Sequence, residues 1–235
     1  KAMNHLYDRN RQNALAGSYG GYFQLANKPR EEPMSLHADF YHTNAAYGIA
    51  AYSKGATFLH QMSYIVGKEA FMEGMRDYYR QWQFKHPYPI DFKTVMERST
   101  GVQLDWYFNL FLNTTRTIDY GIKQVSTTPD TTTVTLENHG KIPMPLDVQV
   151  TFANGDKQLY YIPLRMMRAE KPNNYDMPRT TLADWPWTHP SYQFSIGTAD
   201  RTVEAVRIDP SKRVADVRRS NNQWPEDSSK QIKGN

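Results

Sequence analysis

The apolar residues of this chain change their period near residue 117, and this change constrains the fold more than any other feature of the sequence. Before it, apolar residues recur at helical spacing, as in the segment 58–66. After it, they alternate with polar residues, as in 131–136 and 146–152. Helical spacing indicates amphipathic helices, and alternation indicates half-buried strands. The chain is therefore expected to be α+β, with a helical part followed by a sheet domain.

Three helices are predicted from this pattern and from the residues that end it. The first runs through 58–66 and ends at Gly67, since glycine is the usual residue after a helix. The second covers about 69–84 and stops before two prolines. A later helix over 104–111 is apolar on most sides, so we expect it to be largely buried.

Two further helical segments are less regular. Asp91 is expected to cap a short helix that ends near Gly101. Residues 3–16 are compatible with a helix, and the glycines within 17–21 are expected to loosen the chain after it.

The second half of the chain predicts an antiparallel β-sandwich. Many short strands without intervening helices favour a sandwich of about seven strands. Residues 165–190 are a long insertion rich in Pro, Asn and Trp. The predicted organisation is a helical part over 1–117, a sandwich over 118–219 and a frayed polar tail over 220–235.

Composition excludes several classes of protein. The net charge is +4, from 28 basic and 24 acidic residues spread along the chain, so we expect no nucleic-acid partner. No window reaches the roughly 18 consecutive apolar residues of a membrane span. The absence of cysteine excludes disulfides, thiolate metal sites and a cysteine nucleophile. Together with the many Tyr and Trp residues, it inclines us towards a bacterial periplasmic or secreted protein.

One short motif points to chemistry. Tyr47 and Tyr52 stand five residues apart, and Tyr52 begins a Tyr-Ser-Lys-Gly sequence at the head of a helix. An ordered series follows, including Ile-Val-Gly-Lys-Glu-Ala-Phe, Arg-Asp-Tyr-Tyr, Ser-Thr-Gly and Leu-Asp-Trp-Tyr-Phe. Over residues 35–117 this series resembles the aminopeptidase N family of zinc peptidases, of the gluzincin clan. The likeness continues more weakly into 138–146.

The resemblance implies a fold, a reaction and two site residues. It implies the helical C-terminal part of a thermolysin-like catalytic domain, followed by a small β-sandwich, and a peptide substrate. Tyr52 would be the catalytic residue that donates a hydrogen bond to the oxyanion of the attacked carbonyl. Tyr47 would line the substrate cleft. The alternative from spacing alone is that both are buried aromatic residues with satisfied hydroxyls.

The sequence departs from the family pattern at the metal. Zinc chemistry in this family needs His-Glu-x-x-His on a helix and a further Glu ligand, and none of the seven histidines forms that motif. His37 and His42 are five residues apart and would not share a helical face. We therefore expect no metal ligands in this chain. Zinc would bind in a longer protein whose N-terminal part is missing here, and this C-terminal fragment would be inactive alone.

A second interpretation keeps the architecture without the chemistry. The chain would then be a non-catalytic binding or structural module. Trp185 and Trp187, close to several arginines, would be its candidate surface for peptides or glycans. The competing expectation is that these aromatic residues cover an open sheet edge.

Overall fold

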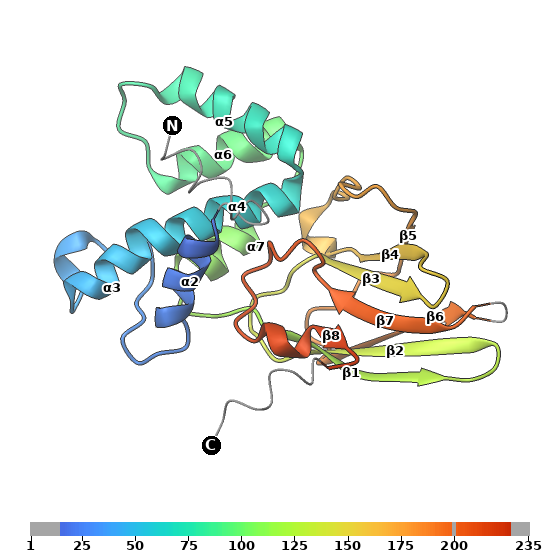
Figure 1. Cartoon of the computed structure of the whole chain (residues 1–235). Coiled ribbons are helices and arrows are strands. Elements are labelled where there is room, and N and C mark those ends of the chain that lie inside the picture. Colours follow the sequence, from blue (N-terminus) through green and yellow to red (C-terminus); the bar gives the residue numbers. More distant parts are fainter. Residues whose placement is uncertain (1–14, 199–200, 227–235) are drawn as a thin grey trace, which may run out of the picture.

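The computed structural model describes residues 15–198 and 201–226 of the chain. Figure 1 shows the helices gathered on one side of the molecule and two sheets on the other. The helical part comprises α2 (Ala16–Leu25), η1 (Ala38–Phe40), α3 (Asn44–Gly48), η2 (Ile49–Lys54), α4 (Gly55–Val66), α5 (Lys68–Trp82), α6 (Pro89–Thr100), α7 (Asp105–Tyr107) and η3 (Phe108–Leu112). None of the helices in the described ranges is long and apolar enough to cross a membrane.

The helix ends follow the predicted breakers, with one exception. Gly67 after α4 and Gly101 after α6 have φ angles of 90° and 70°, which glycine adopts at little cost. The predicted role of Asp91 as the N-cap is wrong. The helix begins earlier, at Pro89, and the Asp91 carboxylate accepts a hydrogen bond from the Tyr88 amide at 2.8 Å. Proline is favoured in the first turn because its fixed φ suits a helix.

Helix α2 is a second difference from prediction, because it runs through all three glycines that were expected to loosen the chain. Gly21 is needed for close packing, since a Cβ there would lie 2.4 Å from the Ser53 Oγ. The glycine therefore lets α2 approach η2, and this contact outweighs its poor helix propensity. Most of the helix predicted over 3–16 lies outside the described residues.

The second half forms two sheets. Its strands are β1 (Tyr120–Thr127), β2 (Thr131–Asn138), β3 (Leu146–Phe152), β4 (Lys157–Ile162), β5 (Arg179–Thr181), β6 (Ser191–Gly197), β7 (Val203–Ile208) and β8 (Gln223–Trp224). The sheet orders are β1-β2-β6 and β5-β4-β3-β7-β8. The α+β class is confirmed. One pairing departs from the predicted antiparallel arrangement, because β5, from the insertion, runs parallel to β4.

The alternation in the strands matches their burial. In β2, Val134 and Leu136 are fully buried, and Thr133 and Thr135 beside them are partly exposed. Val134 pairs with Phe194 in β6, and the Phe194 ring lies 5.3 Å from the ring of Tyr160 in the other sheet. The apolar faces of the two sheets therefore pack on each other, as in a sandwich.

The polar tail predicted from residue 220 is wrong for its first residues. Gln223 and Trp224 form the edge strand β8, which pairs with Arg207 and Val206 of β7. The segment is polar because it lies at the edge of a sheet, where one side of the strand remains exposed.

Helix α4 connects the two halves of the molecule through buried polar contacts. The Tyr64 hydroxyl donates to the Pro145 carbonyl and accepts from the Asp147 amide, both at 3.2 Å. The Lys171 ammonium pairs with the Asp147 carboxylate and lies 3.6 Å from the centre of the Tyr64 ring. These contacts fix the sandwich against the helix that follows the Tyr52 motif.

Candidate functional site

The Tyr52 motif lies in a wide helical turn within one continuous helical run. Helix α3 begins after Thr43, whose hydroxyl accepts a hydrogen bond from the Ala46 amide at 3.1 Å. The run continues as the π-helical segment η2 and then as α4. Single π-helical turns inside α-helices occur often at functional sites. Here the π-helical segment contains Tyr52 itself.

Both predicted tyrosines lie at the surface. Tyr52 is 74% exposed, and no group in the described part of the chain bonds its hydroxyl. Tyr47 is 38% exposed, and its ring meets the edge of Tyr41 at 5.5 Å. The alternative that both are buried aromatics with satisfied hydroxyls is therefore wrong. The Tyr52 phenol is available as a hydrogen-bond donor to a ligand.

The lysine of the motif has the opposite environment. Lys54 is fully buried, and its ammonium donates to the Glu31 carboxylate at 3.0 Å and to the Thr114 carbonyl at 3.2 Å. It also lies 5.7 Å from the Tyr22 ring centre and 5.4 Å from that of Phe111. Burial lowers the pKa of Lys54, and the Glu31 charge opposes that effect. Lys54 is thus an internal anchor for the segment that exposes Tyr52.

Glu31 also organises the turn that precedes it. One oxygen of its carboxylate binds Lys54, and the other accepts a hydrogen bond from the Asn27 amide at 3.0 Å. Asn27 has a φ of 60°, a left-handed conformation that asparagine tolerates better than most residues. The Asn27 side chain is held in turn by the Thr117 hydroxyl at 3.1 Å. The motif helix and the turn 26–31 are therefore coupled through a single buried ion pair.

A groove lies between this turn and the start of the motif helix. We call it the Lys28–Arg30 groove, and its volume is about 440 Å³. Its lining residues are Gln24, Leu25, Lys28, Pro29, Arg30, Thr43, Ala45, Ala46 and Ile49. The last of these opens the π-helical segment that contains Tyr52.

The sequence predicts no role for Glu31 or for the groove, because the segment 28–36, with two prolines, reads as an extended loop. The signal that was present is the lysine of the motif. A lysine among apolar residues near a helix start needs a carboxylate partner if it is buried. The motif lysine therefore predicts a carboxylate partner, but it does not identify which of the 24 acidic residues is that partner.

The described residues do not fit a zinc site. No three His, Cys, Asp or Glu side chains gather within the described ranges. His37 accepts a hydrogen bond from the Asp39 amide, and the His42 Nδ1 lies 2.7 Å from the Glu32 carboxylate. The hydrogen bond with His42 lowers the pKa of Glu32. These two histidines thus contact separate carboxylates and form no pair.

His60 is a structural residue whose charge state can be measured. Its Nδ1 lies 3.2 Å from the Tyr19 hydroxyl, and burial together with the Arg213 charge lowers its pKa to about 4 from 6.5. We expect its ring resonance to titrate near pH 4 by NMR, with assignment from a His60→Gln variant. Because the folded pKa is the lower one, the contribution of His60 to stability is lost as pH falls from 6.5 towards 4. A titration midpoint of the His60 ring near pH 6.5 would contradict the lowered pKa.

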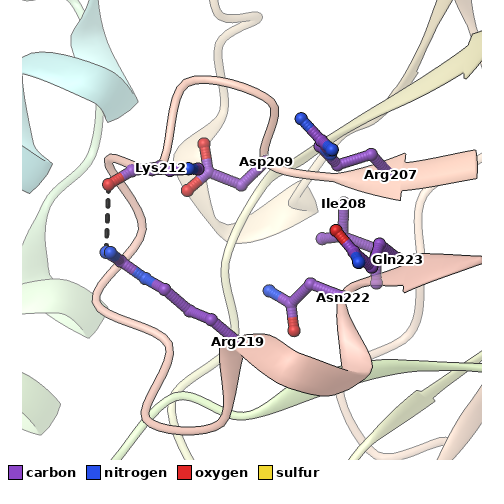
Figure 2. Close-up of a pocket in the computed structure, with 7 residues that line it drawn as sticks. All are labelled: Arg207, Ile208, Asp209, Lys212, Arg219, Asn222 and Gln223. Atoms are coloured by element: carbon purple, nitrogen blue, oxygen red, sulfur yellow. Dashed lines mark hydrogen bonds between the residues drawn. The ribbon is translucent and has the colours of Figure 1, made fainter. Parts of the chain in front are cut away.

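The sandwich carries a separate small pocket of about 190 Å³ (Figure 2). It is lined by Arg207, Ile208, Asp209, Lys212, Arg219, Asn222 and Gln223. Arg219 donates to the Lys212 carbonyl at 3.0 Å, and the Asp209 carboxylate accepts from Ser211 and from the Val214 amide. Several of its polar groups are therefore already hydrogen-bonded within the sandwich, and none of the lining residues comes from the helices around Tyr52.

The tryptophans of the insertion do not form one binding surface. Trp185 is only 7% exposed, stacks on Tyr192 at 5.4 Å and donates its indole N–H to the His189 carbonyl. Trp187 is 62% exposed. Trp185 thus belongs to the core of the sandwich, and only Trp187 is available to a ligand.

Comparisons with known proteins found one family model and solved structures that are similar to this chain. Residues 12–111 match the family model for the peptidase family M1 domain. Among solved structures, the chain is similar to aminopeptidase A of Legionella pneumophila in complex with aspartic acid, with a TM-score of 0.50 and 13% identity. The match covers 73% of this chain and 18% of that one, so this chain spans under a fifth of that protein's length. No curated protein sequence matches the chain.

Proposed function

Taking residues 12–111 as part of a peptidase family M1 domain, we propose that this chain is the C-terminal portion of a zinc-dependent aminopeptidase. The intact protein would remove residues from the N-terminus of peptides. One observation carries the proposal. Tyr52 is exposed, its hydroxyl has no partner among the described residues, and it lies on a π-helical segment that the buried Lys54 anchors.

The contribution of Tyr52 is to stabilise charge. When the peptide carbonyl is attacked, negative charge grows on its oxygen, and a fixed donor lowers the energy of that state. A phenol is a donor at neutral pH. The Lys54–Glu31 pair keeps the Tyr52 backbone in one position, so little reorganisation is needed as the charge develops. Tyr47 lies on the same run and would line the cleft beside the substrate.

Zinc and its ligands belong to the rest of the longer protein in this proposal. Zinc would supply the activated water, and no group among the described residues fits it. The free amino terminus of the substrate would be held by acidic residues of that missing part. We accordingly expect the 235-residue chain alone to be inactive.

The test is the zinc content and activity of the intact gene product that contains this sequence. We expect about one tightly bound zinc per chain, as in mononuclear catalytic sites. We also expect hydrolysis of alanyl-p-nitroanilide but not of its N-acetylated form, because an aminopeptidase needs the free amine. The 235-residue chain serves as a control that binds no stoichiometric zinc. If the intact gene product bound no zinc and did not hydrolyse alanyl-p-nitroanilide, the non-catalytic module would be favoured. Tyr52 would then be a structural residue.

A further inference from the structure

The Lys28–Arg30 groove is positively charged, and its charge is not neutralised by the residues around it. Lys28 and Arg30 are exposed and form no ion pair within the described residues. Among the residues that the structure describes, none that lines the groove carries a carboxylate. The two acidic residues next in sequence are engaged elsewhere, Glu31 with Lys54 and Glu32 with His42. A negative group entering the groove would therefore meet two cations and, within the described part of the chain, no competing anion.

The turn that carries these cations is ordered. The Lys28 amide donates to the Leu25 carbonyl, and the Glu31 amide donates to the Lys28 carbonyl, both at 3.0 Å. The Glu31 carboxylate then binds the Asn27 amide and the buried Lys54. Positions fixed in this way lose less backbone entropy when a ligand binds than those of a mobile loop. The groove is thus a prearranged feature of the same unit that positions Tyr52.

We infer that the Lys28–Arg30 groove binds a carboxylate of the peptide substrate, either its C-terminal carboxylate or an Asp or Glu side chain. The inference rests on the proposed function for its link to catalysis. Ile49 lines the groove and precedes Tyr52 by three residues in the same π-helical segment, which is less than one turn. An extended peptide advances about 3.3 Å per residue. A carboxylate within a few residues of the bond held at Tyr52 would therefore reach the groove.

The shape of the groove agrees with a short peptide segment. Its volume of about 440 Å³ is in the range of small-ligand sites. Apolar walls come from Leu25, Pro29 and Ile49, and polar groups come from Gln24 and Thr43. Such a wall accepts the methylene and methyl groups of a peptide, and the cations at its rim select the charged end.

Binding is measured first on the 235-residue chain, without any requirement for activity. The probes are the tripeptide Ala-Ala-Ala, its C-terminal amide, and Ala-Ala-Asp amide, titrated by NMR at low ionic strength. We expect the free acid to bind about fivefold more tightly than the amide, as two exposed charge pairs would provide. The shifts should fall on the amides of 28–30 and 45–49. The preference should shrink in 1 M salt, where charges are screened within about 3 Å.

Variants test which cations act. The double variant Lys28→Met/Arg30→Met should remove the preference for the acid. The control Lys157→Met, an exposed lysine of the sandwich, should keep it. If Ala-Ala-Asp amide binds as tightly as the free acid Ala-Ala-Ala, the groove also accepts a side-chain carboxylate. If it binds no more tightly than the amide of Ala-Ala-Ala, only the C-terminal carboxylate is recognised. Three results would overturn the inference. They are equal affinity for Ala-Ala-Ala and its C-terminal amide, no chemical-shift change at residues 28–30, and a preference for the acid that persists in the double variant.

The intact enzyme separates this inference from the proposed function. There, the double variant should lower kcat/KM for Ala-Ala-Ala about fivefold, yet leave cleavage of alanyl-p-nitroanilide, which has no carboxylate, unchanged. If the intact protein hydrolysed Ala-Ala-Ala and its C-terminal amide with the same kcat/KM, the inference would be overturned, but the proposed function would stand. Selective binding by the chain, without hydrolysis by the intact protein, would overturn only the proposed function.

Discussion

A Tyr52→Phe variant of the intact protein is expected to fold normally and to lose about 10²–10³-fold in kcat. The loss follows because only the hydroxyl is removed, and that hydroxyl is the proposed donor to the developing oxyanion. The fold should be unaffected because the side chain is 74% exposed and its hydroxyl has no partner in the described structure. Since the interaction forms in the transition state, KM should change little. Steady-state kinetics with alanyl-p-nitroanilide measures both constants.

Two comparisons make this result specific. Tyr79→Phe removes the hydroxyl of another exposed tyrosine, on α5, and should leave kcat unchanged. Zinc content and the unfolding midpoint of Tyr52→Phe should equal those of the wild type. Near-normal turnover in this variant would exclude Tyr52 from the mechanism, whatever the activity of the enzyme.

Replacement of Lys54 should have the largest effect on stability. Lys54→Met keeps much of the side-chain volume but leaves the Glu31 carboxylate, only 2% exposed, without its cation. Removing one partner of a buried ion pair costs about 3–5 kcal/mol, because the remaining charge is uncompensated. The variant should also loosen the turn 26–31, which Glu31 organises. Urea denaturation of the 235-residue chain measures the free energy of unfolding.

The double variant Lys54→Met/Glu31→Leu distinguishes an unpaired charge from lost packing. It should recover most of the stability lost in the single variant, because no buried charge remains. Lys123→Met breaks the exposed pair with Glu137 and should cost less than about 1 kcal/mol. A cost equally small for Lys54→Met would mean that the buried pair does not anchor the motif.

The periodicity of the sequence predicted the larger elements because burial dictates it directly. Helix α4 and its stop at Gly67 follow from apolar residues on one face and a glycine with positive φ. The strands β2, β3 and β4 follow from alternation, since one face of each meets the core. The resemblance predicted from ordered motifs agrees with the match of residues 12–111 to the family model for the peptidase family M1 domain.

The errors occurred where contacts between distant segments outweighed local preference. Helix α2 persists through its glycines because Gly21 allows close approach to Ser53, 32 positions later in the chain. Strand β5 was read as part of an irregular insertion, and it pairs parallel to β4 over only three residues. The short strand β8 has too few residues to show any period. Local pattern cannot reveal pairings as short as these.

For the site, the sequence by itself determined the helix, the two tyrosines and the family to which they point, because these features are local and ordered along the chain. Tertiary structure decided the rest. It exposed Tyr52, buried Lys54 against Glu31, and placed Lys28 and Arg30 beside the start of the π-helical segment. Lys54 and Glu31 are 23 residues apart and follow no period. Such a pair forms because an isolated buried charge is costly, and only the packed chain fixes which charges become buried.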